Sequence, residues 1–323
     1  MRASCCVLVV LLLAALGGCD EAPPAAHIGS PDGPYSLALN LSPPAPPPAT
    51  EALLEFTLTQ GPDRVPVADP QIVHERALHT FIVARDFTSF AHLHHEDYAP
   101  RTDAERAGGR FRFPYVFPHA GDYRIVSEFV HRDRAWSKRF DLRIGEREAA
   151  RPPAAADLAR ERRIGPYTAT LAVSPAVPVA GHEAELVVTL ARDGRPVENL
   201  ALWLGAETHL AIWREDGEHF GHAHSYTAAM ARMMSAMQSH RMDAAHTAAM
   251  MLEMMKLPAT LEYPGPRVPV RHTFPSAGRY RLFFQFAPGG EVLLVPFVLD
   301  VVADDGRVDT HIESIVKLAG AAP

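Results

Sequence analysis

Short apolar and alternating apolar–polar runs recur along the whole chain, separated by Pro, Gly and Asp. Runs of this length, spaced roughly 8–20 residues apart with turn residues between them, predict short antiparallel β-strands. In the first half, the predicted strands are Leu37–Leu39, Leu53–Leu58, His79–Val83, Tyr123–Phe129 and Phe140–Ile144. In the second half, they are Ala184–Leu190, His209–Trp213, Tyr280–Phe286 and Leu293–Val301.

The two halves repeat one another. The segment Gly33–Ser36 returns as Gly165–Thr168, at an offset of 132 residues. Five further residues return at an offset of 130: His79, Asp86, Phe90, His92 and His94 become His209, Asp216, Phe220, His222 and His224. The motif Phe-Pro-x-Ala-Gly-x-Tyr, in which Pro and Gly supply a turn before a strand, occurs at Phe117–Tyr123 and at Phe274–Tyr280, an offset of 157. About seven strands per repeat predict a mainly β protein with two tandem immunoglobulin-like antiparallel β-sandwiches, at 33–145 and 165–302.

The remaining segments are assigned by composition. The stretch 146–164, rich in Ala, Arg and Pro, is predicted to be a linker, and 303–323 a C-terminal tail. Pro43–Pro48 is predicted to be an extended edge of the first repeat. The increase in offset from 130 to 157 indicates an insertion of 27 residues in the second repeat, within 226–257.

The insertion is rich in methionine. Nine of the ten methionines lie in it: Met230, Met233, Met234, Met237, Met242, Met250, Met251, Met254 and Met255. Their spacing predicts a helix or helical hairpin. A packing helix normally mixes several apolar residue types, whereas here Leu252 is the one leucine among Met and Ala. Thioether sulfur favours Cu(I), and all but Met242 are candidate ligands. The alternatives are core packing or an apolar surface that binds a partner protein.

Three histidines of the second repeat converge on one face of a predicted hairpin. Asp216-Gly217 is typical of a two-residue type I′ turn. Counting outward from this turn pairs His209 with His224 and places His222 opposite Ala211, so the three imidazoles share a face. Directly opposite Cβ atoms lie about 5 Å apart, which suits ligation of one Cu(II) or Zn(II) ion.

The first repeat keeps the spacing in His79, His92 and His94, with His74 and His95 nearby. Its turn, Asp86-Phe87, is a weaker hairpin signal, and a longer loop would shift the register. We therefore expect this triad to bind metal more weakly, or not at all. The alternatives for both triads are an exposed polar face or a structural histidine network inherited by duplication.

The N-terminus has the features of an exported protein. A charged start, an apolar run and small residues before Cys19 predict a signal peptide at 1–18. The sequence Leu16-Gly17-Gly18-Cys19 resembles the bacterial lipobox, which implies lipidation of Cys19, a tether at 19–32 and a membrane-anchored position facing the periplasm. The alternative is an uncleaved membrane anchor. Cys5, Cys6 and Cys19 are the only cysteines, so the mature chain has neither an internal disulfide nor a zinc–thiolate site.

The repeats resemble a loosely defined group of exported bacterial β-sandwich proteins, which show Asp, then Phe-x-His-x-His, then Phe-Pro-x-Ala-Gly-x-Tyr. The insertion resembles, in composition, the Met/His segments of periplasmic copper-resistance proteins. We therefore expect a copper-binding or copper-transferring lipoprotein, with zinc as a second candidate metal and a metal-donor or metal-acceptor protein as partner.

Two other functions stay open: a non-metal adhesion or scaffold module that grips a partner through the insertion, and a zinc-dependent enzyme. The sequence contains no nucleophile elbow and no phosphate-binding loop, so an enzyme is the weaker expectation. A net charge of −7 without a basic patch argues against nucleic acid as a partner.

Overall fold

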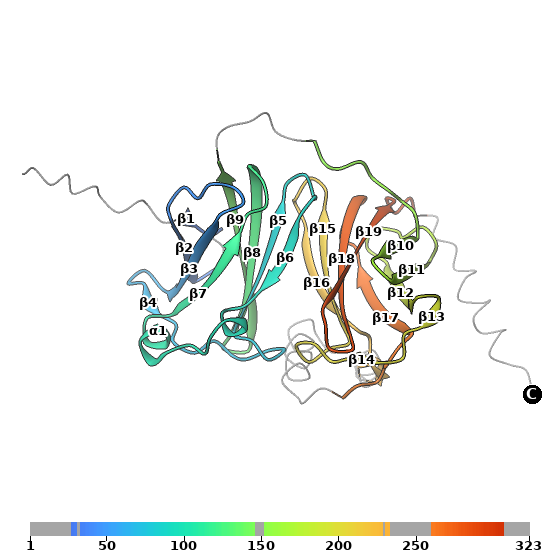
Figure 1. Cartoon of the computed structure of the whole chain (residues 1–323). Coiled ribbons are helices and arrows are strands. Elements are labelled where there is room, and N and C mark those ends of the chain that lie inside the picture. The colour runs from blue at the N-terminus through green and yellow to red at the C-terminus, as the bar shows by residue number, and fades with distance from the viewer. Residues whose placement is uncertain (1–26, 31–32, 146–151, 229, 233–259, 307–323) are drawn as a thin grey trace, which may run out of the picture.

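The computed structural model describes residues 27–30, 33–145, 152–228, 230–232 and 260–306, and Figure 1 shows two β-sandwiches lying side by side. The first contains β1 (His27–Ile28), β2 (Tyr35–Ser42), β3 (Glu51–Gln60), β4 (Val65–Pro66), β5 (Leu78–Ala84), β6 (Phe90–Leu93), η1 (His95–Asp97), α1 (Asp103–Ala107), β7 (Arg110–Val116), β8 (Gly121–His131) and β9 (Arg134–Ile144). The second contains β10 (Glu161–Ile164), β11 (Tyr167–Ser174), β12 (Glu183–Arg192), β13 (Arg195–Pro196), β14 (Leu200–Ala201), β15 (Thr208–Arg214), β16 (Phe220–His224), β17 (Arg267–Thr273), β18 (Gly278–Pro288) and β19 (Leu293–Val301).

Each sandwich consists of two antiparallel sheets. In the first, the order β1-β2-β3-β4, with β7 also paired to β3, faces the order β6-β5-β8-β9. The second repeats this plan, with β10-β11-β12-β13 and β17 in one sheet and β14-β18-β15-β16 and β19 in the other. The predicted fold class, tandem immunoglobulin-like β-sandwiches, is confirmed.

Strict alternation builds a separate core in each sandwich. Along β3, buried residues such as Leu54, Phe56 and Leu58 alternate with more exposed ones, so one face of the strand points into the core. The core of the second sandwich is formed in the same way by Leu186, Val188 and others. Complete burial of one such side chain stabilises the folded state by about 1.5–3 kcal/mol. Each sandwich is therefore stabilised by its own hydrophobic core.

The Phe-Pro-x-Ala-Gly-x-Tyr motif forms a tyrosine corner in both repeats. The hydroxyl of Tyr123 donates to the carbonyl of His119, and that of Tyr280 donates to the carbonyl of Ser276, each at 2.8 Å. A tyrosine that bonds back to the chain just upstream of a strand is characteristic of immunoglobulin-like sandwiches. The motif therefore has a structural role, in addition to the turn that the sequence predicted.

The sandwiches pack against each other through the sheets that carry β5 and β15. Phe90 of the first stacks on Phe283 of the second, with ring centroids 4.4 Å apart, and Phe81 lies 4.9 Å from Phe220. Trp213 belongs to the same apolar cluster. This interface is distinct from the two cores, and it covers the outward faces of the β5–β6 and β15–β16 hairpins.

Several predicted segments differ from the structure. β1 lies in the predicted tether and pairs with β2, and β10 lies in the predicted linker and pairs with β11. Residues 43–48 form the loop between β2 and β3, with no strand pairing, so the predicted extended edge is wrong. Backbone hydrogen bonding to a neighbouring strand, which composition does not report, decides these cases.

Part of the predicted organisation lies outside the described residues. This applies to the signal peptide, to Cys19, to the insertion beyond residue 232 and to the tail beyond residue 306. Within the described part of the chain, no helix has the length and apolar character needed to span a membrane.

Candidate metal centre

The β15–β16 hairpin has the predicted register. His209 pairs with His224, and Ala211 pairs with His222, so the three imidazoles share one face. The turn type is different from that predicted: the amide of Gly217 donates to Arg214, the amide of Arg214 donates to His219, and Gly217 has a positive φ of 78° whereas Asp216 does not. The loop therefore has four residues instead of a two-residue type I′ turn. The predicted two-residue turn and the observed four-residue loop are both centred between Asp216 and Gly217, so the strand register is the same for both.

The β5–β6 hairpin keeps this register as well. Phe81 pairs with His92, and Thr80 pairs with Leu93. Phe87, the counterpart of Gly217, adopts the positive φ (59°) that the loop requires. The expected register shift in the first repeat is therefore wrong, and so is the reason for expecting its triad to bind metal more weakly.

The histidines point away from the core of their own sandwich and lie between the two sandwiches, where the first triad and His209 are buried and His222 and His224 are half-buried. Along β5, Leu78 and Ile82 belong to the core of the first sandwich, whereas Phe81 belongs to the interface cluster. His79 is on the same face as Phe81, because residues two apart on a strand share a face. Its side chain is only 6% exposed, and that of His94 is 0% exposed. An exposed polar face is therefore wrong as an explanation of the repeated histidines.

The inner triad, His79, His92 and His94, brings three ring nitrogens together. Nδ1 of His79 lies 3.3 Å from Nε2 of His92. Nε2 of His94 lies 3.0 Å from each of these two atoms. The three atoms come from two paired strands and the residue that follows β6, so the hairpin register alone brings them together.

The other nitrogen of each ring in the inner triad meets an oxygen acceptor. Nε2 of His79 is 3.0 Å from the carbonyl of Val73. Nδ1 of His92 is 3.0 Å from Oε1 of Gln285, and Nδ1 of His94 is 2.8 Å from the carboxylate of Asp97. Each outer nitrogen therefore carries the N–H, which leaves a lone pair on each inner nitrogen.

Three facing lone pairs at this spacing fit a metal ion. Bonds of 2.0–2.1 Å at tetrahedral angles put ligand nitrogens roughly 3.3 Å apart, close to the 3.0–3.3 Å of the inner triad. Ligating histidines also typically donate their other N–H to a carboxylate or carbonyl, which fixes the ring orientation. Imidazole donors suit Zn²⁺ and Cu²⁺, so the donor set fits the predicted metals.

The second triad, His209, His222 and His224, repeats this arrangement in its ring positions, but only His209 and His222 bring ring nitrogens close to each other. Nδ1 of His209 lies 3.2 Å from Nε2 of His222, and Nε2 of His209 meets the carbonyl of Trp203 at 2.9 Å. The centroid of the His224 ring is 4.5 Å from that of His209 and 4.4 Å from that of His222. The corresponding distances from His94 in the inner triad are 4.8 and 4.5 Å.

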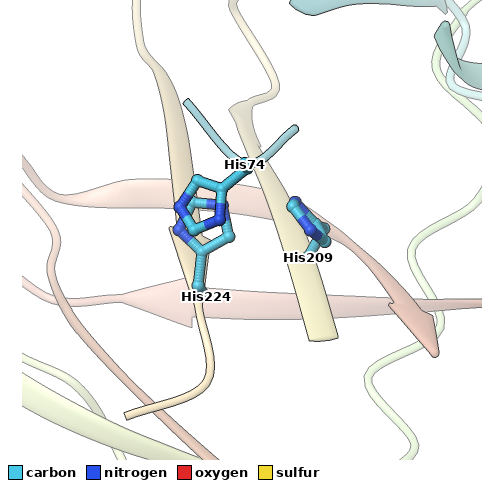
Figure 2. Close-up of side chains that lie close together, drawn as sticks. All are labelled: His74, His209 and His224. Carbon is cyan, nitrogen blue, oxygen red and sulfur yellow. The ribbon is translucent and has the colours of Figure 1, made fainter. Parts of the chain in front are cut away.

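His74 from the first sandwich joins the second triad. Figure 2 shows its ring over that of His224, and the two centroids are 3.8 Å apart with 27° between the planes. The candidate ligand atoms of His74, His209 and His224 all lie within 4.8 Å of one another. The sequence showed His74 only as a nearby histidine, because its counterpart in the second repeat is Leu204 and no repeated pattern marks it.

Burial keeps five imidazoles of the two triads neutral. Desolvation lowers the pKa of His79, His92, His209 and His224 well below the usual value, and neighbouring histidines lower it further. For His94, desolvation lowers the pKa while the hydrogen bond to Asp97 opposes this change. Neutral imidazole is the form that binds a metal ion.

A pocket of about 530 Å³ lies beside the second triad. Its lining includes His74, His222, His224, His272, Trp136 and Met230. Met230 is the first methionine of the insertion and is half-buried. It lies at the start of a helical segment, where its amide donates to the hydroxyl of Thr227 at 3.2 Å. The other candidate thioether ligands, Met233, Met234, Met237, Met250, Met251, Met254 and Met255, lie outside the described residues.

The fold and these clusters define a protein of two tandem immunoglobulin-like sandwiches with a buried histidine centre between them. The chain belongs to the family described as Domain of unknown function (DUF8832), whose model matches residues 30–146 and again residues 162–303. The family description names no activity. No curated protein matches the chain.

Solved structures with some similarity have low scores. The adhesin FdeC of Escherichia coli is 10% identical at a TM-score of 0.22, and the match covers 82% of this chain and 64% of that one. Trypsin-activated alpha-2-macroglobulin of Escherichia coli is 11% identical at a TM-score of 0.23, and the match covers 85% of this chain and 16% of that one. The fibronectin(III)-like modules of Clostridium thermocellum CbhA are 9% identical at 0.18, with 84% and 97% covered. The chain thus spans less than two thirds of the adhesin and macroglobulin chains.

Proposed function

We propose that this protein binds a transition-metal ion at the inner triad, and that copper is its physiological metal. The observation that carries the proposal is the convergence of three ring nitrogens, Nδ1 of His79 and Nε2 of His92 and His94, which lie 3.0–3.3 Å apart. The oxygen acceptors at the other nitrogens leave a lone pair on each of them. A cluster of neutral imidazoles without a shared proton or ion has only repulsion between these lone pairs. A bound cation replaces that repulsion with three coordinate bonds.

The methionine-rich insertion favours copper over zinc in this proposal. Met230 lines the pocket beside the second triad, together with His222 and His224, and eight more methionines follow within 25 residues. Imidazole serves Cu(II) and Zn(II) alike, whereas thioether selects Cu(I). A protein with both donor types next to each other is suited to holding copper in either oxidation state.

We place this activity at the bacterial cell envelope, on the basis of the signal-like segment and the Leu-Gly-Gly-Cys sequence that ends at Cys19. A lipid anchor there would hold the two sandwiches on the periplasmic side, where copper is received from, or passed to, a partner protein. Replacement of Cys19 with alanine should release the protein from the membrane fraction or block its maturation. A variant that still fractionates as mature lipoprotein would contradict the anchor.

The test of metal binding is analysis of the purified mature protein after incubation with Cu(I), Cu(II) or Zn(II). We expect the parent to retain copper after gel filtration, and the His92→Ala variant to lose the ion held by the inner triad. His182→Ala is the matched control, because the partly exposed His182 pairs with Asp304 and belongs neither to a triad nor to the lining of the pocket. A parent protein that retains no metal would overturn the proposal and favour an adhesion or scaffold module.

A further inference from the structure

We infer that the second triad and His74 form a separate metal site that both sandwiches share, so that one divalent copper or zinc ion ties the two sandwiches together. This inference rests on the proposed function, and it adds a ligand, a second ion and a consequence for domain packing. The first sandwich contributes His74, and the second contributes His209, His222 and His224.

Two buried ring nitrogens at this site form no hydrogen bond with the described residues. Nε2 of His74 and Nε2 of His224 are buried and have no hydrogen-bond partner among the described residues. A buried polar atom without a partner costs about 1–3 kcal/mol, so such atoms require an explanation. Both rings lie at the same cluster, stacked 3.8 Å apart, and one ion between them and His209 would satisfy both.

The remaining two rings already have the orientation that ligation requires. Nε2 of His209 is held by the carbonyl of Trp203, and Nδ1 of His222 is held by the carboxylate of Glu128 at 3.1 Å. Their opposite nitrogens, 3.2 Å apart, therefore present lone pairs to the cluster. The ligand atoms that lie together are those of His74, His209 and His224. His222, whose Nε2 is 3.2 Å from Nδ1 of His209, would supply the fourth ligand of a closed tetrahedral site.

The repeats are asymmetric at the position that joins the sandwiches. His74 has a φ of 47° and its counterpart Leu204 a φ of 51°, so the backbone is the same and only the side chain differs. The inner triad, which faces Leu204's repeat, receives no equivalent histidine from it. The bridging ligand is thus specific to the second site. His74→Leu introduces the side chain that the other repeat has at the equivalent position, Leu204, where the φ angle is similar.

Binding should also draw the sandwiches together. The candidate ligand atoms of His74, His209 and His224 lie within 4.8 Å of one another, whereas a tetrahedral ion holds ligand nitrogens roughly 3.3 Å apart. His74 lies on the short loop closed by the pairing of Val73 with Arg76, so this loop can move toward β15 and β16 without disturbing a sheet.

The experiment compares the parent protein with His74→Leu by competitive titration with Zn(II) and Cu(II), and by calorimetric unfolding with and without metal. We expect the parent to bind two ions, and His74→Leu to bind the second at least tenfold more weakly while the first is unchanged. With metal bound, we expect the parent to unfold in a single transition and His74→Leu to unfold in two. His182→Leu is the matched control, and His74→Asn, which tolerates positive φ, replaces His74→Leu if that variant does not fold.

The outcomes separate this inference from the proposed function. If the parent binds no ion at all, the proposed function fails and the shared site fails with it. If the parent binds metal at the inner triad but His74→Leu and His74→Asn keep every affinity and the same unfolding profile, the shared site is refuted and the proposed function stands. Loss of the second ion alone, with the inner triad intact in both variants, supports the shared site.

Discussion

Glu128 and Gln285 occupy equivalent positions in the two repeats, and each binds the central histidine of the other sandwich. Oε2 of Glu128 is 3.1 Å from Nδ1 of His222, and Oε1 of Gln285 is 3.0 Å from Nδ1 of His92. Each sandwich thus supplies a hydrogen-bond acceptor to a histidine of the other. A carboxylate supports one site and an amide supports the other, so the two sites are chemically distinct.

This difference predicts unequal metal affinities. A carboxylate behind a ligating histidine raises its basicity, and loss of such a partner typically costs 10–100-fold in affinity. We expect Glu128→Gln to weaken the second site about tenfold and to leave the inner triad unchanged. Gln285→Glu should strengthen the inner triad. Competition with a chromophoric chelator measures both constants, and unchanged affinities in the two variants would show that the outer contacts are only structural.

The second triad should act as a unit. With the inner triad removed by His92→Ala, a further His222→Ala replacement should weaken the remaining Cu(II) or Zn(II) site by more than tenfold, about 1.4 kcal/mol. The physical reason is that His222 shares the cluster with His209, only 3.2 Å away. Isothermal titration of the single and double variants provides the comparison, with His182→Ala in place of His222→Ala as the control. If His92→Ala and the double variant His92→Ala/His222→Ala bind the ion with equal affinity, His222 is not a ligand.

The methionines should matter for Cu(I) alone. Substituting leucine for the nine methionines between positions 230 and 255 keeps the apolar volume nearly constant while removing every thioether of the insertion. We expect Cu(I) affinity to fall, and Zn(II) binding at the histidines to be unchanged. A leucine variant that binds Cu(I) as tightly as the parent would refute the thioether role and leave a partner-binding surface as the explanation of the insertion.

The tyrosine corners should contribute to stability in both sandwiches. Tyr280→Phe removes the 2.8 Å hydrogen bond to the carbonyl of Ser276 and leaves the ring in place. We expect a loss of about 1 kcal/mol in the free energy of unfolding, measured by urea denaturation. Tyr123→Phe should have a similar effect through His119. A loss below a few tenths of a kcal/mol in both variants would mean that water replaces the hydroxyl.

Acid should destabilise the protein partly through His272. Burial, and to a smaller extent His219, lowers the pKa of His272 from 6.5 to about 4. The unfolded chain therefore takes up a proton on this residue near pH 6.5, which the folded chain does not accept until about pH 4. Its contribution to stability is complete above pH 6.5 and decreases as the pH falls toward 4. Urea denaturation across this range should show a shallower decline for His272→Phe than for the parent, and parallel declines would contradict the assignment.

The amino-acid sequence determined the fold class, the duplication and the register of both histidine hairpins. Period-two alternation and turn residues are local signals, and a cross-strand pair such as His209 and His224 follows from counting outward from a turn. The count held even though the turn type was wrong, because register depends on the centre of the loop and not on its dihedral angles.

Tertiary structure alone decided that the two triads meet. No local signal reports which outward faces of two separate sandwiches will pack together, because that depends on shape complementarity between surfaces such as those of Phe90 and Phe283. This packing wholly or partly buries the histidines and brings Glu128, Gln285 and His74 to them from the other sandwich. A single histidine without a repeated counterpart, such as His74, acquires its place in the site only through the contact between sandwiches.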